Sequence, residues 1–157
     1  MEQDAVSAVE PDEVWISNRM MTARVLIVED EMLVAMDMEA LIEDLGFEPI
    51  GIAADRRDAM RLAGLAPDVA LVDLNLRDGL TGPGIGRDLA ARGVQVVFVT
   101  ANPRELKGGI NGTLGVCEKP IDDGTIASVL GFAIARREGR NLPPPPGFSP
   151  FSGVPAH

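Results

Sequence analysis

Short apolar runs alternate with longer amphipathic segments along most of the chain. The runs are rich in β-branched residues and are bounded by turn-forming residues, as is typical of buried strands. Five strands are predicted, over residues 24–28, 49–53, 69–73, 94–100 and 113–117. Apolar residues at helical spacing predict helices over 31–46, 55–65, 84–92 and 122–139. This alternation predicts an α/β fold, a doubly wound parallel sheet of five strands with helices on both faces.

Local signals mark the ends of two of these helices. The first helix carries one apolar stripe and is expected to end at Gly46, because glycine is a common C-terminal stop. The stripe consists of Val34, Met38, Leu41, Ile42 and Leu45. Asp122 is the expected N-cap of the last helix, where its carboxylate can accept a hydrogen bond from a free backbone N–H.

The connection between residues 100 and 113 differs from the others. Pro103 lies near its start, and Gly108, Gly109 and Gly112 lie near its end. Because each glycine inside a helix costs roughly 1 kcal/mol relative to alanine, a full helix is not expected here. One or two helical turns followed by a loop are predicted, in a segment that the glycines make pliable.

Both ends of the chain differ from the middle. Residues 1–22 are rich in acidic side chains and show no sustained periodicity, so we expect a flexible extension. Residues 141–157 contain six of the twelve prolines and no Asp, Glu, Lys or Arg. Such a run is typical of polyproline II structure or disorder, so we expect a disordered tail, with a proline-recognition partner as the alternative. The folded domain is therefore predicted to span residues 23–140.

Composition argues against several classes of function. The 157 residues suffice for one domain with a core, and a net charge of −10 argues against nucleic-acid binding through phosphate neutralisation. No apolar window is long enough for a membrane span, and the first residues lack the apolar region of a secretory signal. The single cysteine, Cys117, fits a buried thiol in a cytoplasmic protein. The single histidine is His157, the last residue, so histidine-based catalysis is not expected.

Polar residues stand where the predicted strands end. Glu29 and Asp30 follow the first strand, Asp73 ends the third, Thr100 ends the fourth and Lys119 follows the fifth. Sites in open parallel sheets gather at the carboxyl ends of the strands. We therefore expect three carboxylates, a hydroxyl and an ammonium group to meet at one edge of the sheet. Each of them alone has an ordinary structural explanation, such as a helix cap or a surface turn, and only the joint arrangement indicates a site.

The stretch VLIVEDE crowds three acids at the end of a buried strand. Like charges at this spacing repel one another, so a divalent cation is expected to offset the cost. Carboxylate oxygens together with water suit Mg²⁺. The predicted ligands are Glu29, Asp30 and Asp73, with the backbone carbonyl of Asn75 as a further ligand. Glu31 begins a helix and is assigned to the helix dipole rather than to the site.

The expected arrangement suits one kind of chemistry. A carboxylate beside a metal ion, an ammonium group and a hydroxyl can accept a phosphoryl group as an acyl phosphate. In this scheme Mg²⁺ and Lys119 neutralise the phosphoryl oxygens as charge develops. Thr100 can donate a hydrogen bond to another oxygen, and the small side chain of Ala101 leaves space for the group.

Four stretches in this order resemble the signatures of a known family. VLIVEDE, ALVDLNL, VFVTA and CEKP are similar to those of the receiver domain of bacterial two-component response regulators, and the resemblance covers residues 24–139. It implies a flavodoxin-like fold of the receiver type and a Mg²⁺-dependent site. It also implies that Asp73 is the phosphorylated aspartate, Glu29 and Asp30 the acidic metal pair, Thr100 the switch hydroxyl and Lys119 the lysine of the family.

The sequence departs from the family pattern at three places. Glu29 stands where aspartate is commoner, and NLRDG replaces the Met-Pro that often follows the phosphoacceptor. Val116 stands where the family carries an aromatic switch residue, so a conformational signal is expected to run through the segment 102–112 instead. The stretches DMEALIEDLGFEPIGIA and TANPREL further resemble receivers linked to bacterial general stress responses.

The resemblance implies a single-domain response regulator that takes a phosphoryl group from a sensor histidine kinase. Its output is expected to be protein contact, or relay to a phosphotransfer protein or downstream regulator. Beyond assisting its own phosphorylation and slow autodephosphorylation, it is not expected to be an enzyme. Neither nucleic acid nor a membrane is expected as a partner, and the expected location is cytoplasmic.

Two other hypotheses are kept. A phosphorylation-independent pseudo-receiver would be a binding module with a vestigial metal site, but the set Asp73, Thr100 and Lys119 argues against it. A small flavodoxin-like enzyme or cofactor carrier would need aromatic rings to stack on a flavin, and the chain has no tyrosine. The stretch GPGIG, at residues 82–86, has the wrong spacing for a dinucleotide-binding fingerprint.

Overall fold

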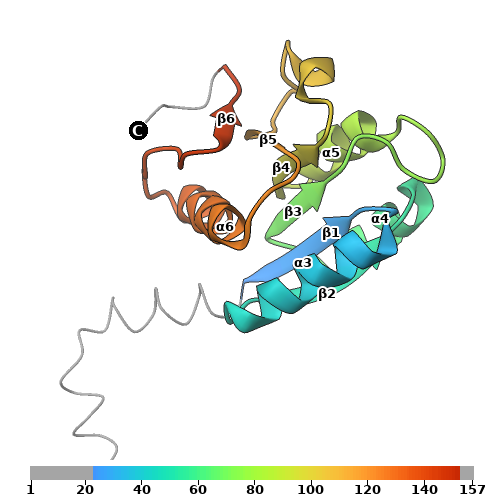
Figure 1. Cartoon of the computed structure of the whole chain (residues 1–157), viewed down its shortest axis with the longest axis horizontal. Helices are drawn as coiled ribbons and strands as arrows, with labels where there is room; N and C mark the ends of the chain where they lie inside the picture. Colours follow the sequence, from blue (N-terminus) through green and yellow to red (C-terminus); the bar gives the residue numbers. More distant parts are fainter. Residues whose placement is uncertain (1–22, 153–157) are drawn as a thin grey trace, which may run out of the picture.

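The computed structural model describes residues 23–152, which form one mixed sheet between two layers of helices (Figure 1). The strands are β1 (Arg24–Val28), β2 (Glu48–Ala53), β3 (Val69–Val72), β4 (Gln95–Thr100), β5 (Gly115–Glu118) and β6 (Phe148–Pro150). The helices are α3 (Met32–Asp44), α4 (Arg56–Ala63), α5 (Gly82–Ala91) and α6 (Asp123–Arg137), with a 3₁₀ turn, η1 (Pro103–Leu106). The acidic N-terminal extension, predicted over residues 1–22, lies outside the described residues.

The sheet confirms the predicted α/β architecture and corrects its strand count. The strand order is β2-β1-β3-β4-β5-β6, and the first five strands run parallel. The sixth strand, β6, pairs antiparallel with β5. It comes from the proline-rich segment that was expected to be disordered, and this expectation was wrong for residues 148–150.

Packing explains why the proline-rich segment is ordered at this point. The ring of Phe148 lies 5.2 Å from the ring of Phe132 in α6, measured between centroids, and Phe148 is buried. Pro150 lies in a strand at the margin of the sheet, where its missing N–H leaves no ladder bond unmade. A strand of three residues is too short to produce a visible alternation in the sequence, so composition alone pointed to disorder.

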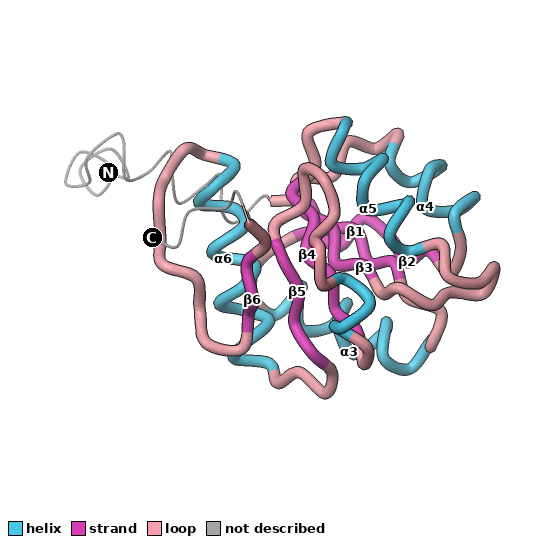
Figure 2. Tube along the Cα trace, turned by 90° about the horizontal axis from the view of Figure 1, so that it is seen from above, coloured by secondary structure: helices cyan, strands magenta, loops and turns pink. Residues whose placement is uncertain are grey.

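Helices lie on both faces of the sheet, as Figure 2 shows from above, and each face carries its own apolar core. On one face, Val25 and Ile27 of β1 belong to a cluster that includes residues of α3 and α6. On the other face, Leu26 and Val28 belong to a cluster with residues of α4 and α5. Neighbouring residues of β1 are thus buried on opposite sides, which places the strand in the middle layer and directs its carboxyl end to one rim of the sheet.

Several local predictions are confirmed. Asp122 caps α6, because its Oδ1 accepts a hydrogen bond of 2.7 Å from the N–H of Thr125. Gly46 follows α3 with φ of 90°, a backbone angle that favours glycine. The connection after Thr100 holds one short turn, η1, followed by loop. Within residues 23–152, no helix has the length and apolar character needed to cross a membrane.

Candidate functional site

Three carboxylates meet at the rim of the sheet. Glu29 and Asp30 follow β1, and Asp73 follows the adjacent strand β3. Each of Glu29, Asp30 and Asp73 offers a carboxylate oxygen that lies within 4.8 Å of the others. Glu29 and Asp73 are buried, whereas Asp30 is exposed. The convergence predicted from the strand ends is therefore present in the structure.

Main-chain hydrogen bonds hold these acids in place. The N–H of Glu29 donates to the carbonyl of Ala53 over 2.8 Å, and the N–H of Asp73 donates to the carbonyl of Val28 over 2.9 Å. The Asp73 Oδ1 accepts a further bond of 2.7 Å from the N–H of Leu74. Both acids are thus continuations of the strand ladders, so their positions are set by the sheet rather than by mobile loops.

Lys119 lies between the two buried acids. Its Nζ donates to Glu29 Oε1 over 2.5 Å and to Asp73 Oδ2 over 3.0 Å. Burial alone would lower the pKa of Lys119, but the hydrogen bonds to the two carboxylates outweigh it and raise this pKa above its ordinary value. Desolvation by burial raises the pKa of Glu29, and the bond from Lys119 offsets only part of that rise. The lysine therefore holds its charge between two acids of which one is poorly solvated.

Thr100 brings the following loop to the site. Its side chain is buried, and its Oγ1 accepts a hydrogen bond of 3.0 Å from the N–H of Asn102. The carbonyl of Thr100 accepts a bond of 2.8 Å from the N–H of Lys119. Asn102 was not predicted as part of the site. The signal that could have identified it is the local Ser/Thr turn, in which a hydroxyl at a strand end binds the N–H two residues on.

A cavity of about 320 Å³ opens between these residues. It is lined by Asp30, Glu31, Asp73, Asn75, Thr100, Ala101, Asn102 and Lys119. The four residues expected to accept, contact or leave room for a phosphoryl group therefore line the same cavity. They are Asp73, Thr100, Ala101 and Lys119. Asn75 is exposed and lines this cavity, and the use of its backbone carbonyl as a metal ligand stays a prediction.

Glu31 lies closer to the site than its assignment to the helix dipole implied. It is the N-cap residue of α3, but its side chain makes no capping bond. Its N–H donates to Glu29 Oε2 over 3.1 Å, and its Oε1 lies 3.9 Å from Lys119 Nζ. Glu31 is thus a fourth, exposed acid at the rim of the cavity, brought there by the tight turn from β1 into α3.

Two of the three glycines of GPGIG, Gly82 and Gly86, serve packing. A Cβ on Gly82 would lie 2.0 Å from the carbonyl oxygen of Asp73, so only glycine lets α5 start directly behind this acid. A Cβ on Gly86 would lie 2.4 Å from the ring of Phe98 in β4. This close approach of helix and sheet accounts for the motif without a nucleotide.

The carboxylate cluster has the composition that Mg²⁺ prefers. The cavity is lined by three carboxylates, those of Asp30, Glu31 and Asp73, and by one ammonium group, that of Lys119. Glu29 does not line the cavity, but its carboxylate lies within 4.8 Å of those of Asp30 and Asp73. The surplus negative charge and the oxygen-only donor set suit a hard divalent cation that keeps some of its waters. Glu29, Asp30 and Asp73 are therefore able to hold Mg²⁺ at this rim.

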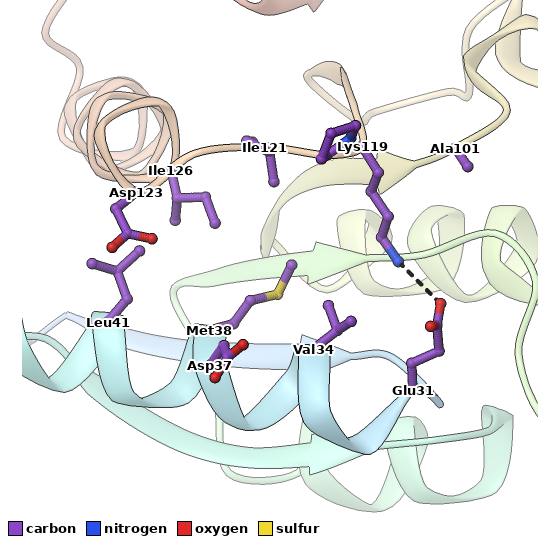
Figure 3. Close-up of a pocket in the computed structure, with 11 residues that line it drawn as sticks. Glu31, Val34, Asp37, Met38, Leu41, Ala101, Lys119, Ile121, Asp123 and Ile126 are labelled. Carbon is purple, nitrogen blue, oxygen red and sulfur yellow. Dashed lines mark ion pairs between the residues drawn. The ribbon is translucent and has the colours of Figure 1, made fainter.

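A groove of about 480 Å³ runs beside the cavity, between α3 and the start of α6 (Figure 3). Its apolar side chains are Val34, Met38, Leu41, Ile121 and Ile126, and its acidic side chains are Glu31, Asp37 and Asp123. Lys119 and Ala101 line both the groove and the cavity. A molecule lying in the groove would therefore reach the carboxylate cluster directly.

The arrangement of acids, lysine and hydroxyl at the rim of a doubly wound sheet agrees with the family match of the chain. Residues 25–130 match the family model of the response regulator receiver domain. The chain belongs to this family. As a receiver domain, it is related to two-component and stress-response regulators.

Individual relatives agree with this placement of the receiver domain. The phyllosphere-induced regulator PhyR of Methylorubrum extorquens is 37% identical over 131 residues, which are 77% of this chain and 49% of that protein. The structure of the anti-anti-sigma factor PhyR from Bartonella quintana is 27% identical, with a TM-score of 0.67 over 87% of this chain and 57% of that one. The chain thus spans about half the length of the PhyR proteins that it matches.

A further relative is informative about the metal. The receiver domain of a sensor histidine kinase from Pseudomonas aeruginosa has a magnesium ion coordinated in its active-site cleft. It is 27% identical, with a TM-score of 0.62 over 73% of this chain and 98% of that domain. Binding of Mg²⁺ is therefore a property of a receiver domain with the same fold.

Proposed function

We propose that this receiver domain accepts a phosphoryl group on Asp73 and does so with Mg²⁺ at Glu29, Asp30, Asp73 and the backbone carbonyl of Asn75. The observation that carries the proposal is the contact of Lys119 with Asp73 Oδ2, at 3.0 Å, inside a cluster of carboxylates. Asp73 is the buried aspartate of that cluster, and it borders the cavity in which a phosphoryl group would sit.

The phosphoryl donor is the phosphohistidine of a sensor histidine kinase. A carboxylate oxygen of Asp73 attacks phosphorus and forms an acyl phosphate while the P–N bond breaks. The imidazole keeps the electron pair of that bond and leaves as the neutral ring, with the proton that its other nitrogen already carried. Bound Mg²⁺ supplies positive charge to the phosphoryl oxygens. Lys119 donates to one of these oxygens and Thr100 donates its hydroxyl to another, because both border the cavity. Ala101 leaves space for the group.

The groove of Figure 3 is the place for a segment of the donor protein. It is continuous with the cavity through Lys119 and Ala101, and its apolar floor can pack against the face of a helix. The acidic side chains at its rim favour a helix with basic flanks. Phosphoryl transfer and protein docking are thus served by neighbouring surfaces.

The output is contact with another protein, either a downstream regulator or a phosphotransfer protein. The Bartonella quintana relative is an anti-anti-sigma factor, a class that acts by binding protein. The acyl phosphate is lost by slow hydrolysis, which the domain assists on itself without acting on an external substrate. A cytoplasmic location fits a phosphohistidine donor and a reduced Cys117.

Intact mass spectrometry after incubation with Mg²⁺ and acetyl phosphate tests the proposal. Wild type and the control Asp44→Asn, an exposed helix position, are expected to gain one phosphoryl group, and Asp73→Asn none. Equal labelling of Asp73→Asn would move the acceptor elsewhere. Absence of label, together with an NMR spectrum unchanged by Mg²⁺ and beryllofluoride, would favour a phosphorylation-independent pseudo-receiver.

A further inference from the structure

The chain covers the edge of β5 with its own C-terminal segment, residues 141–152. Within it, Ser149 pairs with Val116 and Phe148 pairs with Cys117 in an antiparallel ladder (Figure 2). The N–H of Phe151 extends this pairing by donating to the carbonyl of Leu114 over 3.0 Å. The edge strand of the parallel sheet is therefore closed by a short strand that ends the described chain.

Two aromatic rings hold this strand, one on each face of the sheet. Side chains three positions apart in a strand point to opposite faces. Phe148 packs on the face of α6, against Phe132. Phe151 packs on the opposite face, with its ring centroid 6.3 Å from that of Phe98 in β4. Each ring thus belongs to a different core, and loss of either would loosen the strand.

The backbone of β5 is adapted to this neighbour. A Cβ on Gly115 would lie 2.3 Å from the carbonyl oxygen of Ser149 and 2.6 Å from the ring of Phe148. Any side chain at Gly115 would therefore displace the C-terminal segment. The close packing at Gly115 indicates that the contact between β5 and the C-terminal segment is specific.

Phe151 touches the loop that starts at the candidate site. A Cβ on Gly109 would lie 3.2 Å from the Phe151 side chain, and Phe151, Leu106 and Val116 line a common cavity of about 530 Å³. Because the side chain of Val116 is small, the ring of Phe151 can lie next to it. The ring therefore rests on one end of the segment 103–110, and the cavity leaves that segment room to move.

The other end of the same segment begins at Thr100. The Thr100 Oγ1 binds the N–H of Asn102, and Asn102 directly precedes η1. If the Thr100 hydroxyl moves toward a phosphoryl group on Asp73, Asn102 and η1 move with it, and the packing of this segment against Phe151 changes. A change at the cluster of acids would thus reach the C-terminal segment through one short turn.

We propose that the C-terminal segment is a displaceable edge strand, and that a phosphoryl group on Asp73 weakens its hold on β5 through η1 and Phe151. The inference rests on the proposed function, because it takes Asp73 as the acceptor. In this proposal, Phe151 supplies the aromatic side chain that is missing from β5, where Val116 stands in place of the family's aromatic residue. In the phosphorylated state the edge of β5 becomes accessible, whereas in the present structure it is paired.

Hydrogen exchange of the Phe151 amide, followed by NMR on the full chain, tests this coupling. Exchange with Mg²⁺ and beryllofluoride is expected to be about fivefold faster than with Mg²⁺ alone, at the lower end of ordinary coupling between two sites. Resonance shifts around Asp73 without faster exchange at Phe151 would overturn the coupling and leave the proposed function standing. Absence of any shift around Asp73 would overturn both.

Coupling is reciprocal, so loosening the C-terminal segment must strengthen binding at Asp73. Phe151→Ala is expected to raise the affinity for beryllofluoride in the presence of Mg²⁺ by about fivefold. Ser149→Ala, an exposed change in the same strand, is the matched control and should leave this affinity unchanged. Gly115→Ala displaces the segment without altering either ring and should act like Phe151→Ala. Unchanged affinity in both variants would contradict the inference.

Discussion

A buried cluster and a surface cluster of acids and bases, both within residues 23–152, differ in their surroundings. In the buried cluster, Lys119 is 16% exposed and binds Glu29 and Asp73. In the surface cluster, Arg77 is 64% exposed and forms ion pairs with Asp55 and Asp58. The charges are similar, but the surroundings differ, and the difference decides what each cluster can do.

The surface cluster is satisfied by local structure and solvent. Asp55 Oδ1 caps α4 by accepting a bond of 2.9 Å from the N–H of Asp58. The side-chain bond from Arg77, followed by this capping bond, holds the pKa of Asp55 below its ordinary value. In the buried cluster, by contrast, desolvation raises the pKa of Glu29. An acid that is costly to ionise next to other acids is a place where a cation gains most by binding.

Removing the cation of the buried cluster is expected to have the largest effect. Lys119→Met leaves Glu29 and Asp73 buried without their partner, and the free energy of unfolding without Mg²⁺ is expected to fall by roughly 2–3 kcal/mol. Lys107→Met, at an exposed loop position, is the matched control and should have almost no effect. Urea unfolding followed by circular dichroism measures both. Equal small losses would show that solvent reaches the buried cluster freely.

Stabilisation of the protein by Mg²⁺ should depend on the acid cluster. At about ten times its dissociation constant, Mg²⁺ is expected to raise the free energy of unfolding of the wild type by about 1.4 kcal/mol. Asp73→Asn should be as stable as the wild type or more stable without Mg²⁺, because one of three crowded charges is gone, and it should gain much less from the ion. Urea unfolding with Mg²⁺ and with EDTA compares the two. A large gain of Asp73→Asn from Mg²⁺ would remove Asp73 from the ligand set.

Cys117 sharpens the comparison as an ionisable group that is buried with no charged partner. Burial raises the pKa of its thiol to about 12. Because the unfolded chain loses this proton near its ordinary pKa of 9.0, stability is present below pH 9 and is lost as the pH rises toward 12. At pH 10 the loss is expected to be about 1.4 kcal/mol. Urea unfolding of wild type and Cys117→Val from pH 8 to 10 isolates this contribution of the thiol. If the free energy of unfolding fell equally with pH in both proteins, the prediction would be contradicted.

The smallest effect is expected at the surface cluster. Arg77→Ala removes exposed ion pairs that solvent and salt already screen, so the midpoint of thermal unfolding should fall by less than about 2 °C. Differential scanning fluorimetry at low and high salt measures this shift. A drop as large as that of Lys119→Met would show that exposure does not separate the two clusters.

The buried cluster was predictable because its members stand at strand ends, and the ends of parallel strands meet. Glu29, Asp73 and Lys119 follow from this rule alone. Asp55 also follows a strand, yet it caps α4, and only the geometry of the turn distinguishes a cap from a ligand. The place of Glu31 depends in the same way on the turn from β1 into α3. The position of Asn102 at the site depends on the hydrogen bond from its N–H to the Thr100 hydroxyl, which cannot be predicted from residue spacing.

The fold was predictable to the same depth. The strands β1, β3 and β4 were evident because each is a run of four to six residues, rich in β-branched side chains, that is almost wholly buried. The sixth was not, because Phe148 and Phe151 act through contacts with Phe132 and Phe98, which are distant in the sequence. Contacts of this kind between rings in short, proline-flanked stretches leave no periodic pattern.

The closed edge of β5 also bears on how the protein stays dispersed in solution. An open, flat edge strand invites pairing with another chain and growth into aggregates. Here β6, which contains the exposed Pro150, covers one margin of the sheet. At the other margin, β2 contains Pro49 and a bulge opposite Val25 and Leu26. A chain shortened before Phe148 would expose the ladder of β5 and should therefore self-associate at concentrations at which the longer chain remains monodisperse.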